Sequence, residues 1–298
     1  MQIIADAPVA ELHPGAAPSG WQRGLTFIRA LYSRPISAIS TTLVLVFLLL
    51  ALVGPVIAPY GENQQIVATA RQGPSAQHWF GTDHLGRDVF SRVILGTRAV
   101  IGLSGGGTLL AVLIGATLGL LSGYRGGWFD EILMRLFDSL MSIPVLLLAL
   151  LLLGTLGRSR NAILLVIVVV YAPIVARVVR SVVLGVKTKG FVEAARLRGE
   201  SLFYMLSREI LPSVLPALAV ESALRFSYSI FLVASLGFLG IGVQPPSSNW
   251  GMMVNEARDQ VRQIPWSMYA PIGAIALLVV SVNLLADSLK RIFQQTDV

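Results

Sequence analysis

The chain has 298 residues, of which 54% are hydrophobic and only 13% are charged, and its mean hydropathy is +0.72. Soluble globular domains carry about a quarter charged residues, so this composition excludes an ordinary soluble protein and indicates one polytopic membrane domain. The net charge of +7 is spread through loops beside apolar runs, which favours a membrane protein without nucleic-acid partners. The chain has no Cys and only three isolated His residues, so we expect no disulfide, no thiolate site and no metal site.

Residues 1–35 are expected to form a cytoplasmic N-terminal arm. Residues 1–20 are rich in Pro and Gly and are expected to be unstructured. The apolar side chains that follow fall on one helical face, with Arg residues between them, which suits a helix lying on the inner leaflet. An unstructured basic arm is the alternative. The apolar positions are Trp21, Leu25, Ile28, Leu31 and Tyr32.

Six apolar runs are each long enough to cross a bilayer, which takes about 20 residues per helix. They cover residues 36–58, 100–122, 132–153, 162–184, 214–239 and 269–289. The fold class is therefore all-α, with six transmembrane helices, and both termini lie on one side of the membrane. The excess of Arg and Lys in the loops on the N-terminal side predicts that both termini are cytoplasmic.

This topology divides the chain into a first transmembrane helix, an external loop at 59–95, a five-helix core at 96–291 and a cytoplasmic tail at 292–298. Small residues recur at every fourth position of the second span, which predicts a smooth ridge for close helix packing. They are Gly107, Ala111, Gly115, Gly119 and Gly123. Pro144 and Pro173 are expected to kink the third and fourth spans, because proline removes a backbone donor and clashes one turn back.

Ionisable residues within spans are costly in hydrocarbon, so each needs a pairing or functional explanation. Asp138 lies in the third span, and Glu221 and Arg225 lie four residues apart on one face of the fifth. They could form a polar lining of a translocation path beside a second subunit. Alternatively, they neutralise each other inside the bundle, which we favour for Glu221 and Arg225. Asn283 and Asp287 are expected to tie helices together.

A polar segment at 190–203 between the fourth and fifth spans combines helix-forming residues with features suited to docking. Gly199 stands where a left-handed residue would end a helix, and Glu193 lies in the first turn, free to meet a cation on a partner. The small Ala194 and Ala195 would allow a partner surface to come close. Phe191, Leu202 and Phe203 offer an apolar face.

The spacing of this segment resembles the EAA loop of ABC-importer permeases, which docks on the ATPase. Glu193, Ala194 and Ala195 are followed by Gly199 and then, after ten intervening residues, by Ile-Leu-Pro at 210–212. Two further stretches resemble the DppC/OppC type of dipeptide and oligopeptide permease. Residues 78–92 read HWFGTDHLGRDVFSR, and residues 237–251 read GFLGIGVQPPSSNWG. Residues 283–287, NLLAD, resemble the end of the sixth span in that family.

The external stretches contain the residues that could contact a solute-binding protein: Asp83, Arg87, Asp88, Gln244 and Trp250. Local ion pairing among Asp83, Arg87, Asp88 and Arg92, which would fix the loop, is the favoured alternative. Trp79, Phe80, Trp250 and Trp266 fit an outer aromatic belt.

The resemblance implies a type I ABC importer permease in a bacterial inner or plasma membrane. Its implied partners are a second, DppB/OppB-like permease, two cytoplasmic ATPase subunits, an external solute-binding protein and membrane lipid. The chain has no phosphate-binding loop of the form Gly-x4-Gly-Lys-Ser/Thr. ATP and Mg are therefore assigned to the partner subunits, and this chain is expected to bind no cofactor and to be no enzyme.

The sequence leaves alternatives open for the cargo and for the mechanism. Related permeases carry peptides, nickel chelates, glutathione or opines, with di- and oligopeptides favoured here. A self-sufficient secondary transporter or channel is the rival, but it requires inverted repeats with broken helices and an ion site within the membrane, for which we see no sequence sign. A membrane enzyme is a third alternative, without a recognisable catalytic constellation.

Overall fold

The computed structural model describes residues 20–243 and 247–296, and over these ranges the regular structure is entirely helical. Five helices are long and apolar enough to cross a membrane, and a bent helix pair makes a sixth candidate if it counts as one span. The prediction of an all-α polytopic membrane protein is confirmed. The predicted disorder at 1–20 lies outside the described residues, apart from Gly20.

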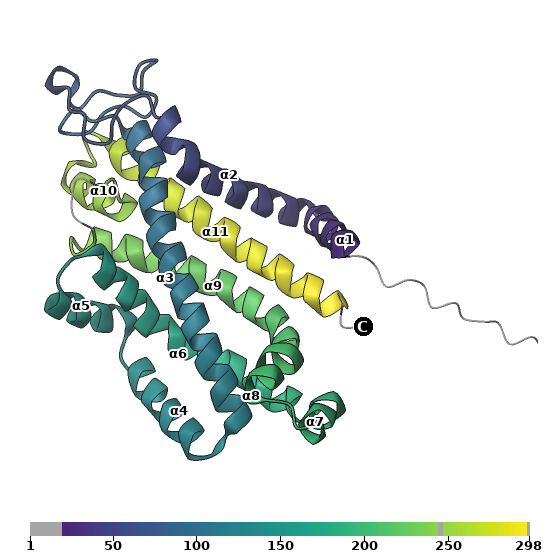
Figure 1. Ribbon diagram of the computed structural model, residues 1–298. Helices are drawn as coiled ribbons and strands as arrows, with labels where there is room; N and C mark the ends of the chain where they lie inside the picture. Colours follow the sequence, from purple (N-terminus) through teal and green to yellow (C-terminus); the bar gives the residue numbers. More distant parts are fainter. Residues whose placement is uncertain (1–19, 244–246, 297–298) are drawn as a thin grey trace, which may run out of the picture.

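In Figure 1 the long helices lie side by side, but not in chain order: the last of them (yellow) packs beside the first (purple). The five long candidate spans are formed by α2 (Pro35–Ile57), α3 (Val89–Arg125), α6 (Arg160–Val186), α9 (Leu211–Phe238) and α11 (Pro265–Thr296). The shorter helices are α1 (Gly20–Tyr32), α4 (Gly127–Met141), α5 (Val145–Leu156), α7 (Gly190–Leu197), α8 (Leu202–Tyr204) and α10 (Trp250–Ala257). A π-helical segment, η2 (Met205–Ile210), and two 3-10 turns, η1 (Val67–Thr69) and η3 (Arg258–Gln260), complete the described structure.

The N-terminal segment from Gly20 forms helix α1 and not an irregular arm. Its Phe27 ring lies 6.0 Å from the ring of Phe293 on α11, centroid to centroid. Trp21, Ile28 and Tyr32 remain exposed. An exposed apolar face on a helix beside the end of the bundle is suited to a membrane interface.

The third predicted span, at 132–153, is not one continuous helix. It is divided into α4 and α5, whose axes differ by 92°. Pro144 lies at the break, as the N-cap of α5, where its missing N–H costs no helical hydrogen bond. The break is therefore far sharper than the expected kink. Pro173, by contrast, is accommodated inside α6, which continues from Arg160 to Val186.

Helix α3 packs closely along α6 through the predicted small-residue ridge. Ala111 and the four glycines of the ridge are all buried. A Cβ added at Gly115 would lie 2.6 Å from the backbone oxygen of Ala172, and one added at Gly107 would lie 2.7 Å from Ile167 Cδ1. Both distances are shorter than the nonbonded contacts that a Cβ atom makes with other heavy atoms. Glycine is therefore required at position 115 for the two backbones to meet, and at position 107 for the Ile167 side chain to fit against α3.

The close approach of α3 and α6 predicts that Gly115→Leu destabilises the bundle. The larger side chain must push α6 away, and overpacking of this kind typically costs about 1–3 kcal/mol. The matched control is Gly154→Leu on α5, where an added Cβ would meet no atom within 4 Å. Thermal unfolding of the purified protein in detergent measures the difference. Equal midpoints for the two variants would mean that the α3–α6 contact does not limit stability.

Candidate functional site

Helix α7 is a short helix held between α6 and α9, and its end is set by a glycine. Gly199 has φ of +76°, the left-handed conformation predicted for it. Its N–H donates to the Arg196 carbonyl at 3.0 Å, and the Glu200 N–H donates to the Ala195 carbonyl at 3.3 Å. These bonds satisfy carbonyls at the helix end and turn the chain towards α8.

One face of α7 is buried against its own chain. Val192 and Ala195 are 0% exposed. They belong to an apolar cluster that includes side chains from α3, α6 and the segment leading into α9: Val112, Ala116, Val175, Val179, Val183, Val186, Met205, Ile210 and Val214. The expectation that Ala195 leaves room for a partner is therefore corrected. Its small side chain lets α7 lie against the bundle, whereas Ala194 is exposed.

The opposite surface of α7 and α8 exposes large apolar side chains at one end of the bundle. Leu197 is 85% exposed and Phe203 is 81% exposed, and Phe191 and Leu202 are partly exposed beside them. Glu193 is also exposed. Leu197 was not among the predicted docking residues, because its position in the sequence does not reveal which way the end of α7 turns. Such a group of exposed apolar side chains is typical of a surface that binds a partner.

Polar contacts attach α7 to the neighbouring helix ends. The Arg196 guanidinium carbon lies 5.6 Å from the centroid of the Tyr124 ring on α3. Lys187 Nζ donates a 2.8 Å hydrogen bond to the Gly123 carbonyl. Arg198 lies 3.5 Å from both Glu200 and Glu209. The contacts of Arg196 and Arg198 join α7 to α3 and to η2, and the contact of Lys187 joins the end of α6 to α3.

The passage from α8 to α9 runs through the π-helical segment η2, which the sequence did not reveal. At its end the Leu211 N–H donates to the Leu206 carbonyl, five residues back. Pro212 follows and has no N–H to donate, so the ordinary α-helical pattern cannot run unbroken through this point. Segments of this kind occur frequently at functional sites within helices.

Residues of the segment 78–92 form a buried ion-pair cluster with α10. Asp83 Oδ2 accepts from Arg87 Nε at 2.6 Å and from Arg92 Nη1 at 2.8 Å. Both arginines also contact Glu256 Oε2 on α10, Arg87 at 2.6 Å and Arg92 at 3.2 Å. The sequence reasoning missed Glu256, which lies 164 residues beyond Arg92. A second buried pair joins His78 Nδ1 to Asp88 Oδ1 at 2.8 Å.

Most of the residues that the sequence suggested as contacts for a binding protein are therefore not available for that role. Asp83, Arg87 and Asp88 are buried, because they hold the loop together through the pairs just described. Trp250 is also fully buried, and its indole N–H donates to the Val93 carbonyl at 2.9 Å, so it does not belong to an outer aromatic belt. Trp79 and Phe80 are exposed. Gln244 lies outside the described residues.

Two acidic side chains of α4 form ion pairs with arginines of α6. Asp138 on α4 pairs with Arg177 on α6, and Asp130 pairs with Arg180 at 2.5 Å. The Asp130–Arg180 pair was not predicted.

Glu221 and Arg225 form the favoured pair within one helix, at 2.7 Å. The Arg225 guanidinium also lies 4.9 Å from the centroid of the Tyr228 ring and 5.9 Å from that of Tyr171. Cation–π contacts of this kind stabilise a charge away from water.

Comparison with known proteins places the chain in a family. Residues 115–296 match the family of binding-protein-dependent transport system inner membrane components, and residues 22–74 match the N-terminal transmembrane domain of oligopeptide transport permease C. The match to the first family covers more than half of the chain.

The matches to similar proteins extend over about nine-tenths of the chain. A dipeptide transport system permease protein, DppC, of Alkalihalophilus pseudofirmus is 33% identical over 92% of this chain and 89% of its own length. A glutathione transport system permease protein, GsiD, of Pectobacterium atrosepticum is 37% identical over 89% and 88%. A probable D,D-dipeptide transport system permease protein, DdpC, of Escherichia coli is 36% identical over 90% of each chain. The chain therefore belongs to the inner-membrane permease family of binding-protein-dependent ABC importers, in its dipeptide and oligopeptide class.

Proposed function

We propose that the chain is the permease subunit of an ATP-driven importer that moves di- and oligopeptides, delivered by an external solute-binding protein, across the membrane. The observation that carries the coupling mechanism is the division of α7 into two faces. Val192 and Ala195 fix the helix to the bundle. Leu197 is exposed at its end, beside the exposed Phe203 of the adjoining α8. A partner that binds the exposed face can therefore move the spans that share the buried face.

In this proposal the partners are a homologous second permease and two ATPase subunits on the cytoplasmic side. The ATPases bind ATP and Mg and dock on the apolar surface of α7 and α8. Their closure shifts α7 together with the adjoining ends of α6 and α9, because the apolar cluster joins the three helices. The bundle then alternates between states open to opposite sides by rigid-body movement.

Peptide cargo is supported by the similar proteins, whose names specify a dipeptide, a D,D-dipeptide or glutathione, itself a small peptide. Glutathione is the second candidate because GsiD proteins are up to 39% identical to this chain. The ligand that copurifies with the cognate solute-binding protein discriminates between the two. A secondary transporter remains the rival mechanism, and it would require uptake to stop when the proton gradient is removed while ATP is present.

The proposed topology places α7 and both termini in the cytoplasm and the loop before α3 outside. Since the chain has no Cys, single introduced cysteines give an unambiguous test. We expect Gln72→Cys to react with an impermeant maleimide in intact cells, and Arg196→Cys to react only after the membrane is opened. Both residues are exposed in the structure. The opposite labelling pattern would reverse the orientation and place α7 out of reach of cytoplasmic ATPases.

The docking role predicts that Phe203→Ser weakens ATPase association by about 10- to 100-fold. Covering a large apolar side chain contributes roughly 1.5–3 kcal/mol, and 1.4 kcal/mol corresponds to a factor of ten. Copurification of the ATPases and ATP hydrolysis stimulated by the binding protein measure the loss. The control is Val67→Ser in the loop before α3, which removes a side chain that is also 81% exposed.

If Phe203→Ser associated normally with the ATPases, α7 and α8 would be a passive connector and not a docking surface. Ala195→Trp is not a suitable test, because Ala195 is buried in its own chain and the variant would disrupt the permease itself.

A further inference from the structure

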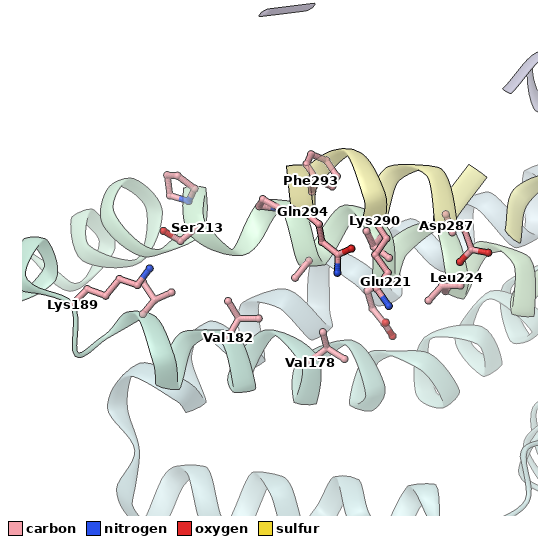
Figure 2. Close-up of a pocket in the computed structure, with 16 residues that line it drawn as sticks. Val178, Val182, Lys189, Ser213, Glu221, Leu224, Asp287, Lys290, Phe293 and Gln294 are labelled. Carbon is pink, nitrogen blue, oxygen red and sulfur yellow. The ribbon is translucent and has the colours of Figure 1, made fainter. Parts of the chain in front are cut away.

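A cavity of about 1030 Å³ lies between α6, α9 and α11. It extends along α9 from Pro212 near the start of the helix to Leu224, about three turns further on. Figure 2 shows α11 and α6 on opposite sides of this space, with the side chains of Val178 and Val182 rising from α6. The cavity therefore begins at the end of the bundle that carries α7 and reaches inward between the spans.

Four charged side chains line the cavity, two of each sign: Lys189, Glu221, Asp287 and Lys290. Glu221 is only 8% exposed, and its single ion-pair partner, Arg225, does not line the cavity. Lys189, Asp287 and Lys290 have no ion-pair partner among the described residues. In Figure 2, Glu221, Asp287 and Lys290 gather at one end of the cavity, and Lys189 lies with Ser213 at the other.

Asp287 does not tie helices together as the sequence had suggested, since its carboxylate is exposed and faces this space.

The wall between these charges is mostly apolar, with Val178, Val182, Val220 and Leu224 among its members. Ligand sites commonly combine such a wall with a few polar groups that fix orientation. An inorganic ion would satisfy charges of one sign only and would leave the apolar wall uncovered. A molecule with an ammonium group, a carboxylate group and an apolar body matches all three features.

We propose that this cavity binds a small zwitterionic peptide, with its ammonium group at Glu221 and its carboxylate group at Lys290. The inference rests on the proposed peptide transport and adds the chemistry by which this chain holds the cargo. Burial of Glu221 strengthens its attraction for the ammonium group, because few water molecules compete for it. Asp287 and Lys189 provide further charges of each sign along the same cavity.

The test measures peptide binding directly, with the permease complex in nanodiscs and the solute-binding protein left out. Equilibrium dialysis compares radiolabelled alanyl-alanine with its N-acetyl and C-terminal amide forms. We expect each modification to weaken binding to the wild-type complex by about 10-fold or more, the usual effect of losing a hydrogen bond between charged groups.

Two variants assign the contacts. Lys290→Gln should bind alanyl-alanine and its amide equally, and Glu221→Gln should bind alanyl-alanine and its N-acetyl form equally. Arg291→Gln is the matched control, because Arg291 is adjacent to Lys290 but does not line the cavity. Lys290→Gln breaks no ion pair of the described residues, so it remains informative if Glu221→Gln leaves Arg225 unpaired and the protein unstable.

A separate uptake assay in proteoliposomes, with the binding protein present, distinguishes this inference from the proposed function. Two outcomes would overturn the zwitterion site and leave peptide transport intact. In the first, alanyl-alanine is taken up but does not bind to the permease complex in the dialysis experiment. In the second, it is taken up, but Lys290→Gln still discriminates between alanyl-alanine and its amide as the wild-type complex does. Binding with the expected discrimination but without uptake of any peptide would support the site and contradict the proposed function.

Discussion

The buried contact between α7 and the ends of α6 and α9 is the constraint on which the proposed coupling depends. Val192 and Ala195 on α7 meet Val183 of α6 and Val214 of α9 within one apolar cluster. Interiors of this kind are close-packed and have low compressibility, so they transmit a displacement and do not absorb it. A short helix on a flexible tether would move alone, whereas α7 can move only together with the spans that cover its inner face.

Two other rigid contacts limit how the bundle can move. The ridge of α3 brings its backbone against α6, so these two helices behave as one unit. At the opposite end from α7, the cluster of Asp83, Arg87, Arg92 and Glu256 joins the start of α3 and its preceding loop to α10. Removing one member of such a buried cluster would leave another charge without a partner, at a cost of several kcal/mol. Movement is therefore expected at an interruption outside these units, the 92° break between α4 and α5.

The hydropathy of runs of about 20 residues predicted most of the fold. A membrane span requires such an apolar run, which can be seen in the sequence without knowing which helices pack against it. The ridge from Gly107 to Gly123 and the left-handed Gly199 were also predictable, since each depends on local geometry that favours one residue type. The sequence could not show that Ala195 faces inward while Leu197 faces outward, because both lie in one short amphipathic helix whose rotation is fixed by α6 and α9. Nor could it pair Glu256 with Arg87 and Arg92, since that contact depends on how α10 packs against the start of α3 and the loop before it. The break at Pro144 was underestimated for the same reason: a proline marks where a helix can bend, and the surrounding helices set the angle.

The central claim, that a partner covers the exposed face of α7, is tested most directly by the reactivity of a cysteine placed on that face. Leu197→Cys in membranes should react with a water-soluble maleimide at least about ten times more slowly when the ATPase subunits are present than when they are absent. Val67→Cys, on the loop before α3, should react at the same rate in both cases, because it is also highly exposed but lies far from α7. Equal rates at Leu197→Cys with and without the ATPases would contradict the account.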